Sequence, residues 1–277
     1  MRMETRWIHK SIGYLLVFSM SLLLSVTATS AKTVTYVKEY TYQASEVDSK
    51  LSCRTIAMEQ VKRLLLEELG TYLISETAVK DFQLTRDRIS SLTAGIVMTV
   101  ILEENWDGKI YFLKAKITTD TDELVRSIDR IRGNQEESKN WEETRKKTEE
   151  ALREIEKLKK EIAEGKGEKV SQEKYAKAVN ELNALDWFKK GYVLRYNAKN
   201  NQEAMKAFDK SIEIDPNYAK AYAGRAAIYN EWGQYQNSLR ESEQAIKLDP
   251  KLPWGFNCRG WAYNGLRNYP KAIEDLT

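Results

Sequence analysis

Apolar and polar residues alternate from Thr33 to Tyr42, which predicts a half-buried strand because strand side chains point to opposite faces in turn. One face of this segment carries Val34, Tyr36, Tyr40 and Tyr42. From about Glu46 to Ile74 the apolar residues recur at helical spacing instead, which predicts one long amphipathic helix. The stripe of this helix consists of Leu51, Met58, Val61, Leu64, Leu65, Leu69 and Tyr72.

Two further strand-like runs cover 96–103 and 110–118. The Asp107-Gly108 pair between them favours the tight turn of a hairpin. A last helix is predicted over 122–131, with Asp120 as its N-terminal cap. Residues 32–132 therefore predict an α+β domain, and about 100 residues are enough to bury one core.

Residues 133–169 are dense in Glu, Lys and Arg and carry a heptad pattern. Its two registers are Trp141, Thr148, Ile155 and Ile162, with Thr144, Ala151 and Leu158 three positions later. Such a seam is typical of a coiled coil, whereas interleaved acids and bases also support a solvated single helix. The pattern leaves two alternatives, a charged spacer helix or a homodimer joined through 141–162. Gly165 to Gly167 then break the helix, and 170–184 predict a covering helix that packs on the C-terminal segment.

The last quarter of the chain repeats itself. Pro216 and Pro250 lie 34 residues apart, and each follows an aspartate that ends a similar segment. The opening of each unit also recurs, as Trp187-x3-Gly191-x2-Leu194, Tyr222-x3-Ala226-x2-Tyr229 and Phe256-x3-Gly260-x2-Tyr263. The small residues Gly191, Ala226 and Gly260 of these motifs allow two helices to approach closely. The Asp-Pro pairs end a helix because proline lacks the amide hydrogen.

This pattern resembles the tetratricopeptide repeat, a helix-turn-helix unit of about 34 residues, over residues 185–277. The resemblance implies an all-α solenoid of three repeats, with one extra residue in the turn around Asn197–Asn201 of the first. The third repeat stops within its second helix at Thr277, so we expect the sequence to be the front part of a longer protein.

Residues 1–31 have the layout of a secretory signal peptide: a basic start, the apolar run from Ile12 to Val26, and small residues up to Ala31. We expect cleavage near Ala31 and a periplasmic or secreted protein, with no later stretch apolar enough to span a membrane. Cleavage leaves 41 basic and 40 acidic residues, so bulk charge does not indicate a nucleic-acid partner.

Catalytic chemistry is poorly represented in the sequence. The single histidine, His9, lies in the predicted signal peptide, which excludes histidine-based triads and metal sites from the mature chain. The acids Asp120, Asp122 and Glu123 are better explained by helix capping than by a metal site. Cys53 and Cys258 are interpreted as small buried residues, although an exported protein could pair them. We therefore predict no enzyme activity, metal or cofactor.

The first helices of the repeats line a concave groove in tetratricopeptide proteins, and this resemblance implies a protein or peptide partner. The groove residues expected from the repeat spacing are Phe188, Tyr192, Arg195, Tyr196, Ala227, Asn230, Asn257, Trp261 and Asn264. A basic pocket for a peptide carboxylate is not matched, because Lys189, Lys190 and Arg195 all fall in one repeat. The alternative is that the aromatic residues pack between helices and the asparagines are solvated.

The predicted strand, long helix, hairpin and helix of the N-terminal domain resemble the amino-terminal domains of some bacterial envelope proteins, including the flagellar assembly protein T type. The sequence thus predicts an exported, non-catalytic adaptor that binds partners through its repeats. Two alternatives remain: an oligomeric envelope component assembled through residues 32–170, and the regulatory front end of a longer enzyme.

Overall fold

The computed structural model describes residues 33–75, 89, 92–94, 96–165, 168–196 and 198–277. The predicted signal peptide lies outside these residues. The chain begins its described part with β1 (Thr33–Gln43), which pairs in a three-stranded antiparallel sheet of order β1-β3-β2. The other strands are β2 (Thr99–Trp106) and β3 (Ile110–Asp120), joined by the predicted turn in which Gly108 has a φ of +98°.

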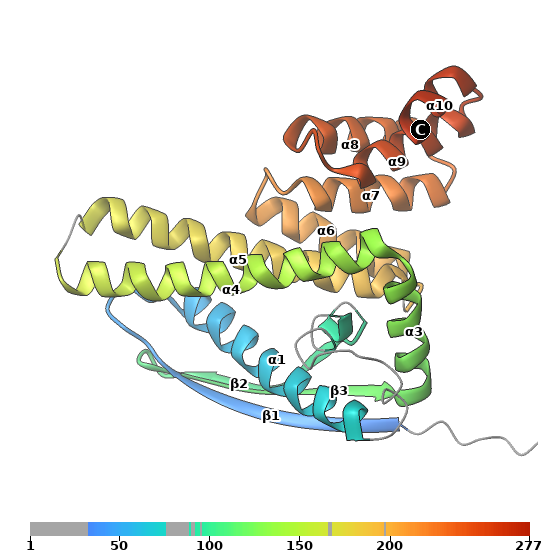
Figure 1. Ribbon diagram of the computed structural model, residues 1–277. Helices are drawn as coiled ribbons and strands as arrows, with labels where there is room; N and C mark the ends of the chain where they lie inside the picture. Colours follow the sequence, from blue (N-terminus) through green and yellow to red (C-terminus); the bar gives the residue numbers. More distant parts are fainter. Residues whose placement is uncertain (1–32, 76–88, 90–91, 95, 166–167, 197) are drawn as a thin grey trace, which may run out of the picture. The chain divides into compact units, whose positions relative to one another are not determined.

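One face of the sheet is covered by α1 (Lys50–Ser75), as Figure 1 shows. The central strand β3 buries Tyr111, Leu113, Ala115 and Ile117 on this face, and α1 buries Cys53, Ala57, Val61, Leu65 and Leu69 against them. The next helix, α3 (Thr121–Gly133), begins at Asp120, whose carboxylate accepts from the backbone amides of Asp122 at 2.9 Å and Glu123 at 3.1 Å. The predicted α+β order and this cap are confirmed.

The heptad seam has its partner within the same chain. Helices α4 (Gln135–Ala163) and α5 (Glu168–Tyr196) form a hairpin that lies beside α1 (Figure 1). The seam residues Ile155, Leu158 and Ile162 are buried in a cluster with side chains of α5 and with Ile56 of α1. Trp141, Thr144 and Thr148 are buried as well. Neither a solvated spacer nor a dimer seam through 141–162 describes this arrangement, because the apolar stripe is already covered.

A buried carboxylate ties this hairpin to the sheet layer. Asp48 has a fully buried side chain that accepts from Lys159 Nζ of α4 at 2.9 Å and from the Tyr175 hydroxyl of α5. It also accepts from the Tyr42 hydroxyl of β1 at 3.2 Å and from the Ser45 amide at 2.8 Å. Burial alone would raise the pKa of Asp48, but these hydrogen bonds outweigh it and lower the pKa to about 2.

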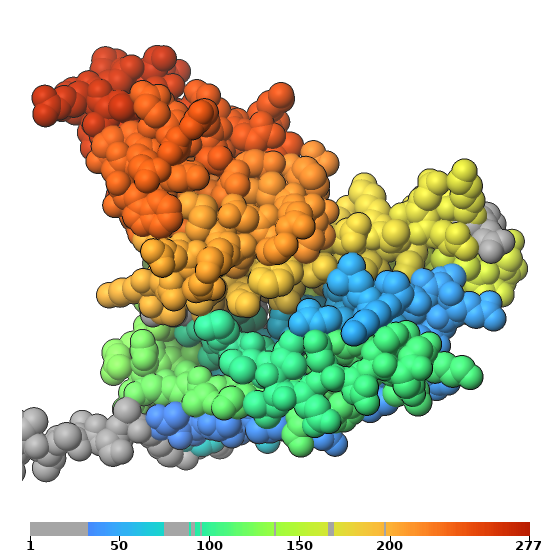
Figure 2. Space-filling model, turned by 180° about the vertical axis from the view of Figure 1, so that it is seen from behind, coloured from blue at the N-terminus to red at the C-terminus, as the bar shows by residue number. Residues whose placement is uncertain are grey.

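The remaining helices pair as repeat units. The end of α5 pairs with α6 (Asn201–Ile214), α7 (Ala219–Glu231) with α8 (Tyr235–Leu248), and α9 (Pro253–Gly265) with α10 (Tyr269–Leu276). Four residues separate α5 from α6 and three separate the helices of the other pairs, so the extra residue lies in the predicted turn. In Figure 2 helices α6 to α10 form a continuous block coloured orange to red. The covering helix expected over 170–184 and the first repeat helix are a single helix, α5.

The small residues of the repeats have a specific steric role. The ring of Phe208 on α6 is fully buried between Gly191 of α5 and Gly224 of α7. A Cβ atom at either glycine would lie within 2.7 Å of ring carbons. The equivalent position of the second repeat is Ser242, where Ala226 and Cys258 replace the two glycines. The first repeat thus combines a large ring with two glycines, and the second combines a small serine with two larger residues. The larger residue at one position compensates for the smaller residues at the others, as dense core packing requires.

Candidate functional sites in the repeats and the helical layer

Helix α4 of the same chain covers the part of the predicted groove that belongs to the first repeat. Tyr192 packs edge-on against Trp141 of α4, with ring centroids 4.9 Å apart, and its hydroxyl donates to Glu137. On the next repeat, Lys220 Nζ lies 3.5 Å from Asn140 Oδ1 of α4. Phe188 is buried among aromatic rings of neighbouring helices. Burial first, and the charge of Glu137 second, raise the pKa of Tyr192 far above its usual value.

An ion pair links the first two repeats at the turn end of their helices. Arg195 of α5 pairs with Glu231 of α7, and its guanidinium lies 4.3 Å from the ring centroid of Tyr196. Glu231 also accepts from Asn201 Nδ2 at 2.6 Å. Nε and Nη1 of Arg195 are buried without an acceptor among the described residues. Arg195 thus positions α7 against α5 while keeping two hydrogen-bond donors unused.

Two other predicted groove residues are structural. Asn230 is buried and donates through Nδ2 to the carbonyl oxygen of Cys258 at 2.8 Å, which connects α7 to α9. Ala227 is buried against the same helix. A substitution of Asn230 would therefore break packing between repeats as well as any ligand contact.

The predicted groove residues on α9 are exposed. Trp261 has 62% of its surface accessible, the joint highest value among the large apolar side chains of the described residues. Asn257 and Asn264, four residues before and three after it, are exposed on the same helix. Residues at this spacing share one helix face, so α9 offers an aromatic ring flanked by two amide side chains.

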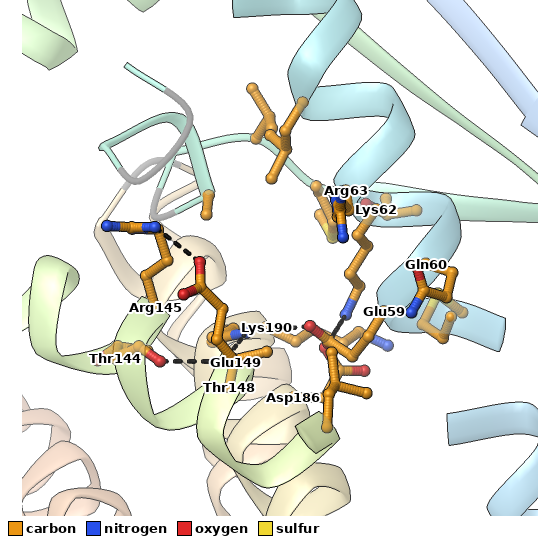
Figure 3. A pocket seen from close by; sticks show the side chains of 18 of the residues that line it. Glu59, Gln60, Lys62, Arg63, Thr144, Arg145, Thr148, Glu149, Asp186 and Lys190 are labelled. Carbon is orange, nitrogen blue, oxygen red and sulfur yellow. Dashed lines mark hydrogen bonds and ion pairs between the residues drawn. The ribbon is translucent and has the colours of Figure 1, made fainter. Parts of the chain in front are cut away.

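A second candidate site lies in the helical layer, and its residues were not identified from the sequence. We call it the interhelical cleft: a cavity of about 870 Å³ between α1, α4, α5, Ala94 and residues 97–101. Figure 3 shows Arg145 and Glu149 of α4 on one side of it and Lys62 and Arg63 of α1 on the other.

Buried charges form the floor of the interhelical cleft. Glu59 is 7% exposed and pairs with Lys62 at 3.3 Å and Lys189 at 3.4 Å, and Lys62 also pairs with Asp186. Lys189 donates in addition to the Thr148 hydroxyl at 3.1 Å. Burial lowers the pKa of Lys62 to about 8. Burial alone would raise the pKa of Glu59, but Lys189 and Lys62 outweigh it and lower that pKa.

The described residues offer little else that is reactive. Both cysteines are free and buried, and burial raises the pKa of Cys53 to about 11 and that of Cys258 to about 12. Within the described part of the chain no group of three metal-ligating side chains comes together. Helices long and apolar enough to cross a membrane are likewise not found among those residues.

Comparison with known families agrees with the helix pairs. Tetratricopeptide repeat models match residues 187–218 and 207–240. The chain carries tetratricopeptide repeats. The two matches together cover the end of α5, α6, α7 and the first part of α8.

The curated relatives resemble this repeat region over a short length. Hsp70-Hsp90 organizing protein 3 of Arabidopsis thaliana is 35% identical over 72 residues, which are 26% of this chain and 13% of the relative. Small glutamine-rich tetratricopeptide repeat-containing protein 2 of Mycosarcoma maydis is 32% identical over 77 residues, 28% of this chain and 22% of that protein. This chain therefore spans less than a quarter of the length of these two relatives.

A solved structure is also similar to part of this chain. The second TPR of Spaghetti (RPAP3), bound to HSP90 peptide SRMEEVD, is 25% identical with a TM-score of 0.34, covering 35% of this chain and 84% of that chain.

Proposed function

We propose that the protein is a non-catalytic adaptor whose repeats bind a protein or peptide partner. The observation that supports this most directly is the exposed face of α9 with Trp261, Asn257 and Asn264. Large aromatic side chains are enriched at the energetic centres of protein interfaces, and Trp261 is exposed to 62%. One relative named above is an Hsp70-Hsp90 organizing protein, which agrees with protein binding by such repeats.

The partner's binding surface is narrower than the sequence spacing predicts. Because α4 covers Tyr192 and approaches Lys220 of the second repeat, and Ala227 and Asn230 are buried, the exposed groove positions are those of the third repeat on α9. Its polar members are the two exposed asparagines of α9, and an asparagine side chain both donates and accepts hydrogen bonds. The surface thus suits an extended peptide or a helix that places an apolar side chain on Trp261 and backbone or amide groups on Asn257 and Asn264.

We further propose that the protein is exported and works in the bacterial cell envelope. The layout of residues 1–31 supports export, and the sheet and helix order of residues 33–133 supports an accessory envelope domain.

A pull-down from an envelope extract tests the adaptor function. The full chain is compared with Trp261→Ala plus Asn264→Ala, two substitutions at exposed positions that leave the buried contacts of α9 in place. Trp232→Ala is the matched control, because Trp232 is 42% exposed but lies in the turn after α7. We expect specific partners to be lost from the double variant and retained by the control. The same partner list for all three proteins would rule out binding through α9.

A further inference from the structure

The interhelical cleft has the size and composition of a ligand site. Its volume of about 870 Å³ falls within the range of about 300–1,000 Å³ that is usual for small-molecule pockets. The cleft lies between α1 and the α4–α5 hairpin, away from the exposed face of α9 that the proposed adaptor function uses.

The walls of the cleft differ in polarity. Residues 97–101 contribute an apolar wall that includes Val97, Met98 and Ile101, and α1 adds Met58 and Leu66. Methionine side chains are flexible and adapt to the shape of an apolar ligand. Charged side chains come from α4 and α5 and also from α1, whose charged lining residues are Arg54, Glu59, Lys62, Arg63 and Glu67.

Cations exceed acids by two among the charged side chains that line the cleft. The lining as a whole contains seven Lys or Arg residues and five Asp or Glu residues. On α4, Arg145 and Arg153 share one carboxylate, Glu149, at 2.6 Å and 3.4 Å. On α5, Lys190 lies 4.8 Å from the Trp187 ring centroid and has no ion pair among the described residues. Nε of Arg145 is buried without an acceptor in that part of the chain. A negatively charged group of a ligand would supply the hydrogen-bond acceptor that Arg145 Nε and Lys190 lack among those residues.

We propose that the interhelical cleft binds a small amphipathic anion: a carboxylate or sulfonate that carries an apolar chain. Its acidic group pairs with Arg145 and Lys190, and its apolar chain lies on Met58, Val97 and Met98. The apolar chain leaves water for one wall, while the head group meets the cations of the other, so a ligand lacking either part loses much of the affinity.

Titration calorimetry with the full chain tests this assignment, using decanoate as the probe. Decylammonium has the same chain with the opposite charge and serves as the ligand control. We expect saturable 1:1 binding of decanoate, and an affinity for decylammonium lower by about tenfold or more, since a hydrogen bond to a charged group is worth about 1.5–3 kcal/mol.

Protein variants locate the binding to this cleft. Arg145→Gln is expected to weaken decanoate binding by about tenfold. Lys157→Gln removes the same charge from α4 at a site 63% exposed and outside the cleft, and should bind as the wild type does. Met98→Trp fills the apolar wall and should weaken both probes, whereas Trp261→Ala should change neither. The assignment is overturned if decanoate shows no saturable binding, if decylammonium binds equally well, or if Arg145→Gln and Lys157→Gln behave alike.

Discussion

Replacing Gly224 by alanine tests the packing that joins the first two repeats. A Cβ atom at this position would lie 2.6 Å from Cζ and 2.8 Å from Cε2 of Phe208. Gly191 approaches the ring from the other side so closely that a Cβ there would also lie 2.7 Å from it, which leaves the ring little room to retreat. Overpacking a core costs about 1–3 kcal/mol, whereas alanine is favoured over glycine inside a helix by about 1 kcal/mol. Taking the packing cost at its upper end, we expect a net destabilisation of about 2 kcal/mol.

Thermal unfolding followed by far-UV circular dichroism measures this effect. For a chain of this size, about 2 kcal/mol lowers the Tm by about 4–8 °C. Gly133→Ala is the matched control, since a Cβ there meets nothing within 4 Å, and its Tm should not fall. Phe208→Leu removes the ring, so the double variant Phe208→Leu plus Gly224→Ala should be less destabilised than the sum of the single variants, with a coupling of about 0.5–3 kcal/mol. An unchanged or raised Tm for Gly224→Ala, or strict additivity in the double variant, would refute the steric argument.

Three further outcomes are expected. Folding lowers the pKa of Asp48 from 3.8 to about 2, so the carboxylate stabilises the fold by about 2 kcal/mol above pH 4, and this stabilisation is lost as pH falls from about 4 to 2. Asp48→Asn should therefore be less stable than the wild type at pH 7, and the difference in unfolding free energy between the two proteins should disappear on acid titration from about pH 4 to 2. Leu158→Ala should lower stability by about 2–5 kcal/mol without changing the mass measured by light scattering, because the seam is covered by α5; a dimer that becomes a monomer would instead support an intermolecular coiled coil. In an expressing bacterium the protein should be found in the periplasmic fraction with the intact mass of a chain beginning at Lys32. Protein that stays in the cytoplasmic fraction and still carries residues 1–31 would count against export.

The local features of the fold could be predicted from the sequence because each depends on neighbouring residues. Alternation predicts β1, the Asp107-Gly108 pair predicts the hairpin, and Asp120 is the observed cap of α3. The repeat spacing predicts the helix pairs, including the longer turn of the first repeat. The heptad pattern of α4 shows that an apolar stripe must be covered, but the spacing is the same whether the cover is a second copy or α5 of the same chain.

The candidate sites depended on long-range packing and were predicted less well. Repeat spacing places Asn230 and Asn264 at equivalent positions, yet Asn230 is buried beneath the next repeat and Asn264 is exposed. The cover of Tyr192 by Trp141 joins residues about 50 positions apart and leaves no local pattern. Glu59 and Lys62 look like an ordinary surface pair on a helix until α5 brings Lys189 and Asp186 against them.

Site-specific photocrosslinking at position 261 tests the central claim most directly. A photoreactive phenylalanine analogue replaces Trp261 in one variant and Trp232 in a second, which serves as the control on an exposed turn. The adaptor function predicts crosslinks from position 261 to one or a few distinct proteins, with few or none from position 232. Crosslinks that are absent from position 261, or the same from both positions, would contradict binding of a partner on the face of α9.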